Sequence, residues 1–266
     1  MDASNEESFW KKIFQKKGFK PTGRATQFER AVRSETAPKR PAPAYRKARE
    51  STGIFIAEAV KDKRFETAAF TLVSKGKSLD AEHVGDKALQ EGKFGQAIQI
   101  FEKIGNHRKV GLANEIAARD CLEKGGSKKL AAGRMYAAVQ SYGKLLADKN
   151  EDRVLTMKKM ALICDDLADL LTGNNDYFGA AETYLYGAQL YRYLTPLAHV
   201  HEHFTADPDF FARVEEKLLE DAGHAKDAFR RHVEQNNVDP KSDMGRKIIE
   251  KLKKIEELIK YASKSG

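Results

Sequence analysis

The chain has 266 residues, of which 41% are hydrophobic and 32% charged, which suits one large domain with long solvated helices. Its net charge is +8, and its only two cysteines, Cys121 and Cys164, lie far apart, which argues against a disulfide-rich or zinc-cluster protein. A run of about 18 apolar residues is absent and the first residues are acidic. We therefore expect no membrane span and no secretory leader, and a cytoplasmic or nuclear location.

The positive charge is concentrated near the N-terminus. Residues 1–63 contain 15 Lys and Arg against 8 Asp and Glu, a net +7, whereas residues 64–266 carry a net +1. Four of the seven prolines fall within the first 43 residues, so we predict a basic, partly disordered arm over residues 1–53. Its cations could contact phosphates of nucleic acid; the alternative is a solvated tail whose aromatic segment folds back. The candidate anion contacts are Lys11, Lys12, Lys16, Lys17, Lys39, Arg40, Arg46, Lys47 and Arg49.

After the arm, the next proline is Pro196, and helical periodicity continues throughout the interval. Glycines at 76, 92, 125–126 and 173 mark several joints. The predicted fold class is all-α, a degenerate tetratricopeptide-like stack of antiparallel helical hairpins (an α-solenoid) over residues 54–235, closed by a capping helix within 236–266. The predicted helices are at about 53–62, 64–75, 79–91, 94–104, 109–124, 128–147, 151–172, 177–194, 208–235 and 242–262.

Residues 81–105 have the pattern of a helical hairpin, because small residues stand where two helices must touch and aromatic residues fill the space beside them. The segment resembles the tetratricopeptide repeat through Gly85, Ala88, Gly92, Phe94, Ala97 and Phe101, which follow that family's order. The resemblance implies a binding scaffold. Asp86 stands where members that clamp acidic tails carry Asn, which disfavours that activity.

The same spacing of an aromatic residue, an alanine and a bulky residue recurs around Phe65, Phe94 and Phe178, at offsets of 29 and 84 residues. A longer segment, residues 81–145, is similar to the helical-repeat tails of fungal helicase-like proteins of the UvrD/Rep type. The resemblance implies an accessory scaffold without helicase activity, because the chain has no phosphate-binding loop. The residues that carry it are Phe94, Ala97, Phe101, Lys103, Gly105, Ala113, Asn114 and Arg119.

Candidate catalytic and metal-binding residues are few. His199 and His203 are four residues apart, a spacing that can place two imidazoles on one zinc ion, but we expect a solvated helix end and no metal. The acidic side of the helix around Asp165 and Asp169 is expected to face water. Cys164 beside these acids should have a raised thiol pKa. We therefore expect no enzyme and no cofactor.

Tyr177, Tyr184 and Tyr191 repeat every seven residues and so share one helix face. They are either core residues of a hairpin or aromatic anchors on a protein-binding surface. The expected function is a non-enzymatic scaffold or adaptor for a protein partner. The alternative is a nucleic-acid-associated module acting through the arm; we do not expect binding to a membrane surface.

Overall fold

A computed structural model describes residues 53–147, 152–198, 209–210 and 213–265, and all of the regular structure in these residues is helical. The predicted basic arm lies outside the described residues. A helix over residues 53–61 comes first. The helices that follow are α3 (Phe65–Ser74), α4 (Ser78–Gln90), α5 (Phe94–Lys103), α6 (His107–Glu123), α7 (Lys128–Leu145), α8 (Arg153–Thr172), α9 (Tyr177–Ala198), α11 (Val214–Asn236) and α12 (Asp243–Ser265).

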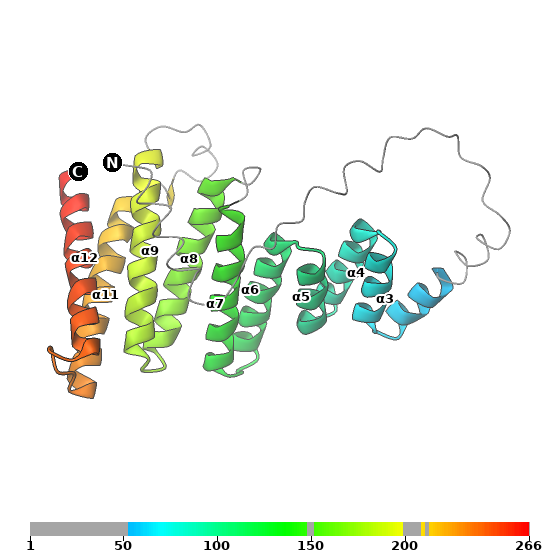
Figure 1. Ribbon diagram of the computed structural model, residues 1–266, viewed down its shortest axis with the longest axis horizontal. Helices are drawn as coiled ribbons and strands as arrows, with labels where there is room; N and C mark the ends of the chain where they lie inside the picture. Colours follow the sequence, from blue (N-terminus) through cyan, green and yellow to red (C-terminus); the bar gives the residue numbers. More distant parts are fainter. Residues whose placement is uncertain (1–52, 148–151, 199–208, 211–212, 266) are drawn as a thin grey trace. The chain divides into compact units, whose positions relative to one another are not determined.

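Helices that follow one another in the chain pack side by side and in opposite directions (Figure 1). Residues 51–266 form one compact unit. The predicted fold class, an all-α stack of antiparallel helical hairpins, is confirmed. Two helix boundaries differ by several residues: α9 continues through Pro196, and α11 begins at Val214 and not near residue 208.

Short polar and glycine signals set the helix boundaries. The side chains of Asn106, Ser127 and Asp152 accept hydrogen bonds from backbone N–H groups in the first turns of α6, α7 and α8. Gly92 ends α4 with φ +70°, a left-handed conformation that favours glycine. At the end of α8, Gly173 is the C-cap at the predicted joint, and the left-handed residue that follows is Asn175.

The hairpin predicted over residues 81–105 is formed by α4 and α5. Gly85 is buried at the crossing, and a Cβ atom added there would lie 2.6 Å from Cε1 of Phe101. Ala88, Ala97 and Phe101 are fully buried, whereas Phe94 is half-buried. The small residues therefore allow the close approach of the two helices, as the pattern predicted.

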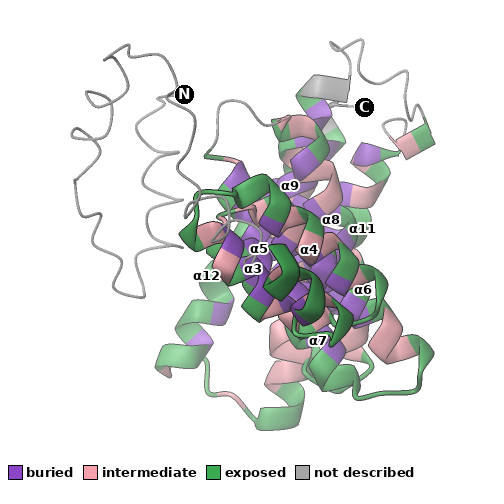
Figure 2. Cartoon of the chain, turned by 90° about the vertical axis from the view of Figure 1, so that its right-hand side faces the viewer, coloured by how far each residue is buried: buried purple, intermediate pink, exposed green. Residues whose placement is uncertain are grey.

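Two hydrophobic cores meet at α6. One core extends from α3 to the first half of α6 and contains Phe65, Phe101 and Val110. The other begins at Ala118 in the second half of α6 and continues to α12. Figure 2 shows the buried residues on the faces between helices and the exposed residues on the outside. On α12, Ile248 and Ile255 are buried, while Leu252 and Ile259 on the same stripe pack against the core from its edge.

The Gly85 contact predicts the outcome of a single substitution. Gly85→Ala should reduce the free energy of unfolding by about 1–2 kcal/mol, because overpacking costs about 1–3 kcal/mol and exceeds the gain of about 1 kcal/mol in helix propensity. Urea denaturation measures the change. As the control, Gly223→Ala on α11 has open space around the new methyl group and should stabilise by about 0.5–1 kcal/mol. Equal effects of the two substitutions would contradict the close contact.

Candidate functional site

The residues predicted to bind anions because of their charge, and the histidines whose spacing suits a metal ion, lie outside the described residues. This applies to all nine basic residues of the arm and to His199 and His203. Within the described residues, no group of three His, Cys, Asp or Glu side chains is arranged to hold a metal ion. None of the described helices combines the length and the apolar character needed to cross a bilayer.

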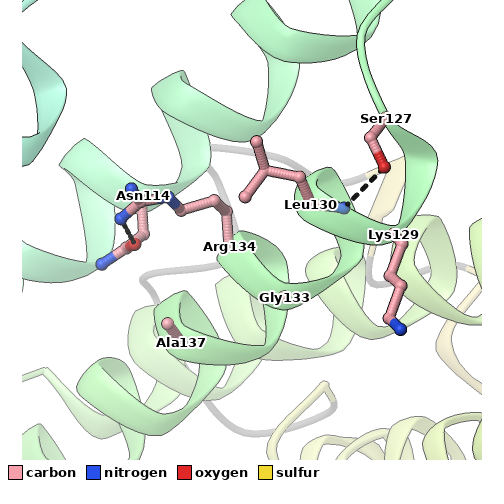
Figure 3. A pocket seen from close by; sticks show the side chains of 7 residues that line it. All are labelled: Asn114, Ser127, Lys129, Leu130, Gly133, Arg134 and Ala137. Atoms are coloured by element: carbon pink, nitrogen blue, oxygen red, sulfur yellow. Dashed lines mark hydrogen bonds between the residues drawn. The ribbon is translucent and has the colours of Figure 1, made fainter.

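A surface hollow of about 530 Å³ lies between α6 and the first half of α7 (Figure 3). The α7 helix packs against α6 and α8 through its face that includes Ala131, Met135 and Ala138, which leaves the opposite stripe uncovered. On that stripe, Gly133 and Ala137 are small, so the surface is recessed between longer neighbours. The lining residues are Asn114, Ser127, Lys129, Leu130, Gly133, Arg134 and Ala137.

The hollow combines an apolar side chain with positive charge. Leu130 is 56% exposed, so its side chain is available to a ligand in the hollow. Lys129 and Arg134 are the charged residues in the lining, which contains no carboxylate. The Arg134 guanidinium is positioned by Asn114, whose Oδ1 accepts from Nη1 at 3.2 Å and whose amide donates to the Val110 carbonyl at 2.9 Å. The lining therefore suits an acidic ligand with an apolar group.

A second hollow, of about 380 Å³, lies where the α5–α6 turn meets the end of α7. Its lining mixes the carboxylate of Glu82 with the cations Arg108 and Lys144. Burial, and then the nearby charge of Lys144, lower the pKa of His107 in its wall. Because opposite charges line it, this hollow favours no single sign of ligand charge.

A polar contact inside the stack joins α6, α7 and α8. The Tyr142 hydroxyl donates to Oε1 of the buried Glu115 at 2.5 Å, and the Lys159 ammonium lies 3.0 Å from the same oxygen. Lys159 also lies over the Tyr142 ring, 4.9 Å from its centroid. Burial, and then the bond to Glu115, raise the pKa of Tyr142, so its hydroxyl stays a donor. Gly111 makes room, since a Cβ atom there would lie 2.7 Å from the ring.

The next hairpin repeats this contact. On α9 the Tyr191 hydroxyl donates to Oδ2 of Asp165 at 2.8 Å, and the Tyr184 hydroxyl donates to Asp169. Both tyrosines are buried, so the structure supports the core alternative for them and not the protein-binding one. Tyr177 is half-buried, and its hydroxyl donates to Asn175. The expectation that the acidic side of α8 faces water is wrong for Asp165, because Tyr191 and α11 cover it.

The carboxyl of Asp221 on α11 also lies at this point of the stack. Asp221 is 2% exposed, and burial together with the neighbouring Asp165 carboxyl raises its pKa to about 9. Cys164 is buried in the same place, and burial raises the pKa of its thiol well above the ordinary value, as the sequence predicted. The thiol is therefore not a nucleophile in this conformation.

These contacts reveal an internal repeat that the aromatic residues at helix starts do not indicate. Residues 109–118 of α6 align with 159–168 of α8 at a spacing of 50, and residues 131–145 of α7 align with 180–194 of α9 at a spacing of 49. Lys109 matches Lys159, Glu115 matches Asp165, and Tyr142 matches Tyr191. In the sequence, the signal of this repeat lies in the paired alanines and the shared Gln-x-Tyr of α7 and α9.

The comparisons with known proteins give structural neighbours only. No protein-family model matches the sequence, and no curated protein matches it significantly. A "Circular tandem repeat protein with novel repeat topology and enhanced subunit contact surfaces" has 14% identity and a TM-score of 0.35; the match covers 79% of this chain and 51% of that one, about half its length.

Two further solved structures are similar over most of their lengths. The "DHF58 filament" has 16% identity and a TM-score of 0.32, with 82% of this chain and 95% of that chain covered. The "de novo designed helical repeat protein DHR64" has 13% identity and a TM-score of 0.28, with 79% and 98% covered. The fold assignment therefore stands on the helix packing of this chain itself.

The Tyr142 hydroxyl is expected to stabilise the fold measurably. Tyr142→Phe should reduce the free energy of unfolding by about 1–3 kcal/mol, because the buried Glu115 carboxylate loses a donor. Tyr136→Phe is the matched control on the same helix, since that ring is 57% exposed, and it should change stability by less than about 0.5 kcal/mol. A Tyr142→Phe variant as stable as the control would show that the bond contributes nothing.

Proposed function

We propose that this chain is a non-enzymatic helical-repeat scaffold that binds a protein partner, and that the partner contributes an acidic segment with an apolar side chain to the hollow on α7. The observation that carries the proposal is the exposed Leu130 between Lys129 and Arg134, with no carboxylate in the lining. An apolar anchor surrounded by charges of one sign is a common way to combine affinity with selectivity.

The family resemblances support a scaffold role of this kind. The tetratricopeptide-like order of Gly85, Ala97 and Phe101 is used in packing, and stacked hairpins are usually binding surfaces. Asp86 is engaged by Lys109, whose ammonium lies 2.6 Å from it, so this position is not open to a peptide tail. The similarity to the helical-repeat tails of helicase-like proteins supports the same scaffold role, with the chain acting as an accessory subunit or domain.

The polar contacts between helices favour structure over catalysis. The acids Glu115, Asp165 and Asp169 each accept a hydrogen bond from a tyrosine hydroxyl of the following helix; Glu115 is buried, Asp165 half-buried and Asp169 exposed. Glu115 is only 7% exposed, so a ligand would have to separate packed helices to reach it. Within the described residues, these acids thus act as hydrogen-bond acceptors between helices, which is the basis for proposing a non-enzymatic protein.

A displayed library of random peptides tests the proposed hollow. Peptides selected on the full chain should be enriched in Asp and Glu next to an apolar residue, because the lining is cationic around Leu130. Leu130→Asp and Arg134→Glu should each weaken the selected peptides at least tenfold, as measured by fluorescence anisotropy.

The control is Leu155→Asp on α8, which changes a leucine of similar exposure, 51%, away from the hollow. It should leave peptide affinity within about twofold of the unchanged chain, since surface substitutions far from a site rarely matter. Peptides of no net charge, or peptides that bind Leu130→Asp as tightly as the unchanged protein, would refute the proposed site.

A second candidate function is binding of nucleic acid by the arm. The net +7 of residues 1–63 against +1 for the remainder is the observation that favours it. Either function is compatible with a cytoplasmic or nuclear location, which we propose on the sequence alone.

Anisotropy titrations with single-stranded and duplex nucleic acid test the arm. If six or more phosphates are contacted, affinity should fall by about 10³-fold or more between roughly 50 and 200 mM salt. Changing Lys39, Arg40 and Lys47 to Gln should weaken binding. It should also reduce the slope of log affinity against log salt concentration by about three. The control removes the same charge from α12, at Lys247, Lys253 and Lys260. Equal losses in the two triple variants would indicate binding by net charge alone and exclude a specific role of the arm.

A further inference from the structure

The junction of α8, α9 and α11 contains two carboxyl groups where a carboxylate and a cation would be expected. Oδ1 of Asp165 and Oδ2 of Asp221 are buried, and no donor in the described structure reaches either atom. Both oxygens lie beside Gly187 on α9: a Cβ atom added there would be 2.5 Å from the Asp221 oxygen and 3.6 Å from the Asp165 oxygen. The two carboxyl groups are within hydrogen-bonding reach of each other.

The two preceding junctions show what is different here. Lys109 of α6 lies over the Phe101 ring and pairs with Glu82 and Asp86 of α4. Lys159 of α8 lies over the Tyr142 ring and pairs with Glu115. At the third junction Tyr191 and Asp165 occupy the places of Tyr142 and Glu115. The group that α11 places directly against the acid is, however, the carboxyl of Asp221, while its nearest ammonium, that of Lys217, is bonded to Glu220.

The surrounding groups do not neutralise the pair. From α9, the Tyr191 hydroxyl donates to the other oxygen of Asp165. From α11, Lys217 faces both acids, but its ammonium is bonded to Glu220 at 2.7 Å and remains about one-third exposed. The remaining titratable groups that face the pair are Cys164 and Asp166 on α8, Tyr184 on α9 and Glu220 on α11.

We propose that Asp165 and Asp221 share one proton in the folded protein, so that a carboxylic acid–carboxylate hydrogen bond attaches α11 to α8 and α9. The proton fills the role that lysine has at the two earlier junctions, and its release to solvent at alkaline pH leaves two like charges in contact. Release therefore weakens the attachment of α11, and with it α12, which packs on α11.

Electrostatics and burial agree with this arrangement. Two carboxylates in contact cannot both remain ionised away from water, so one retains its proton. Burial is the largest cause that raises the pKa of both acids, and the Asp165 carboxyl raises that of Asp221 further, to about 9.

The proton makes stability depend on pH in a defined direction. A carboxyl whose pKa is higher in the folded than in the unfolded chain binds its proton more tightly when folded. Its contribution to the free energy of unfolding is therefore complete below the unfolded pKa of about 4. The contribution decreases as the pH rises toward the pKa of the folded chain. The ratio of unfolded to folded protein should thus increase about tenfold per pH unit in that window, for one proton.

Asp221→Asn tests the inference, because asparagine has the same shape and its amide can donate to Asp165 without titrating. Urea denaturation of the full chain between pH 5 and 9 should show the wild-type unfolding constant rising about tenfold per pH unit relative to this variant. Asp165→Asn should behave in the same way, which provides a second test if one variant does not fold. The control is Asp227→Asn on α11, an exposed acid whose loss should leave the wild-type pH dependence unchanged.

Infrared spectroscopy of the unaltered protein with ¹³C-labelled aspartate gives an independent readout. A C=O stretch of a protonated carboxylic acid should be present at pH 7, lost above pH 9, and missing from both Asn variants. Absence of this band at pH 7, or parallel pH profiles of unfolding for wild type and Asp221→Asn, would overturn the shared proton.

Discussion

The contact of Tyr142 with α6 connects the helices around the first hydrophobic core with those around the second. Gly111 lets the ring lie against the helix backbone, Glu115 accepts a hydrogen bond from the hydroxyl, and Lys159 approaches both from the next hairpin. A buried carboxylate would destabilise the fold if it stood alone, so its two partners make α7 and α8 mutually dependent. Since α6 contributes to both hydrophobic cores, this junction lies where the two cores meet.

The three junctions along the chain repeat one arrangement of an aromatic ring, an acid and a charged group from the next helix. The residue types differ from one junction to the next. Phe101 has no hydroxyl, and the lysine above it pairs with the solvent-facing acids of α4. Tyr142 and Tyr191 have hydroxyls, and each meets an acid on the preceding helix. At the last of these junctions the cation is replaced by Asp221. A pH-sensitive bond at that end, and none at the α6 junction, would confine alkaline weakening to α11 and α12.

Local sequence patterns predicted the helices well, because caps, glycine stops and apolar periodicity act within a few residues. Gly92 ends a helix where the sequence indicated, and α7 begins at the predicted residue 128, capped by Ser127. The repeating aromatic–alanine pattern was also real, since Ala68, Ala97 and Ala181 are buried near the starts of α3, α5 and α9. The start of α7 has the matching Ala132 but no aromatic residue three positions before it, so a pattern that requires the aromatic residue omits this helix.

The sequence by itself determined the all-α hairpin stack, the close contact at Gly85 and the absence of a recognisable catalytic motif, since these depend on spacing along one or two helices. Only the tertiary structure decided which polar residues are buried. Asp165 and Tyr191 look solvent-facing or surface-binding on the helices that carry them, but α11 covers both. The hollow at Leu130 likewise depends on which face of α7 its neighbours leave open. Burial and exposure of this kind are set by residues distant in the chain, and no local pattern encodes them.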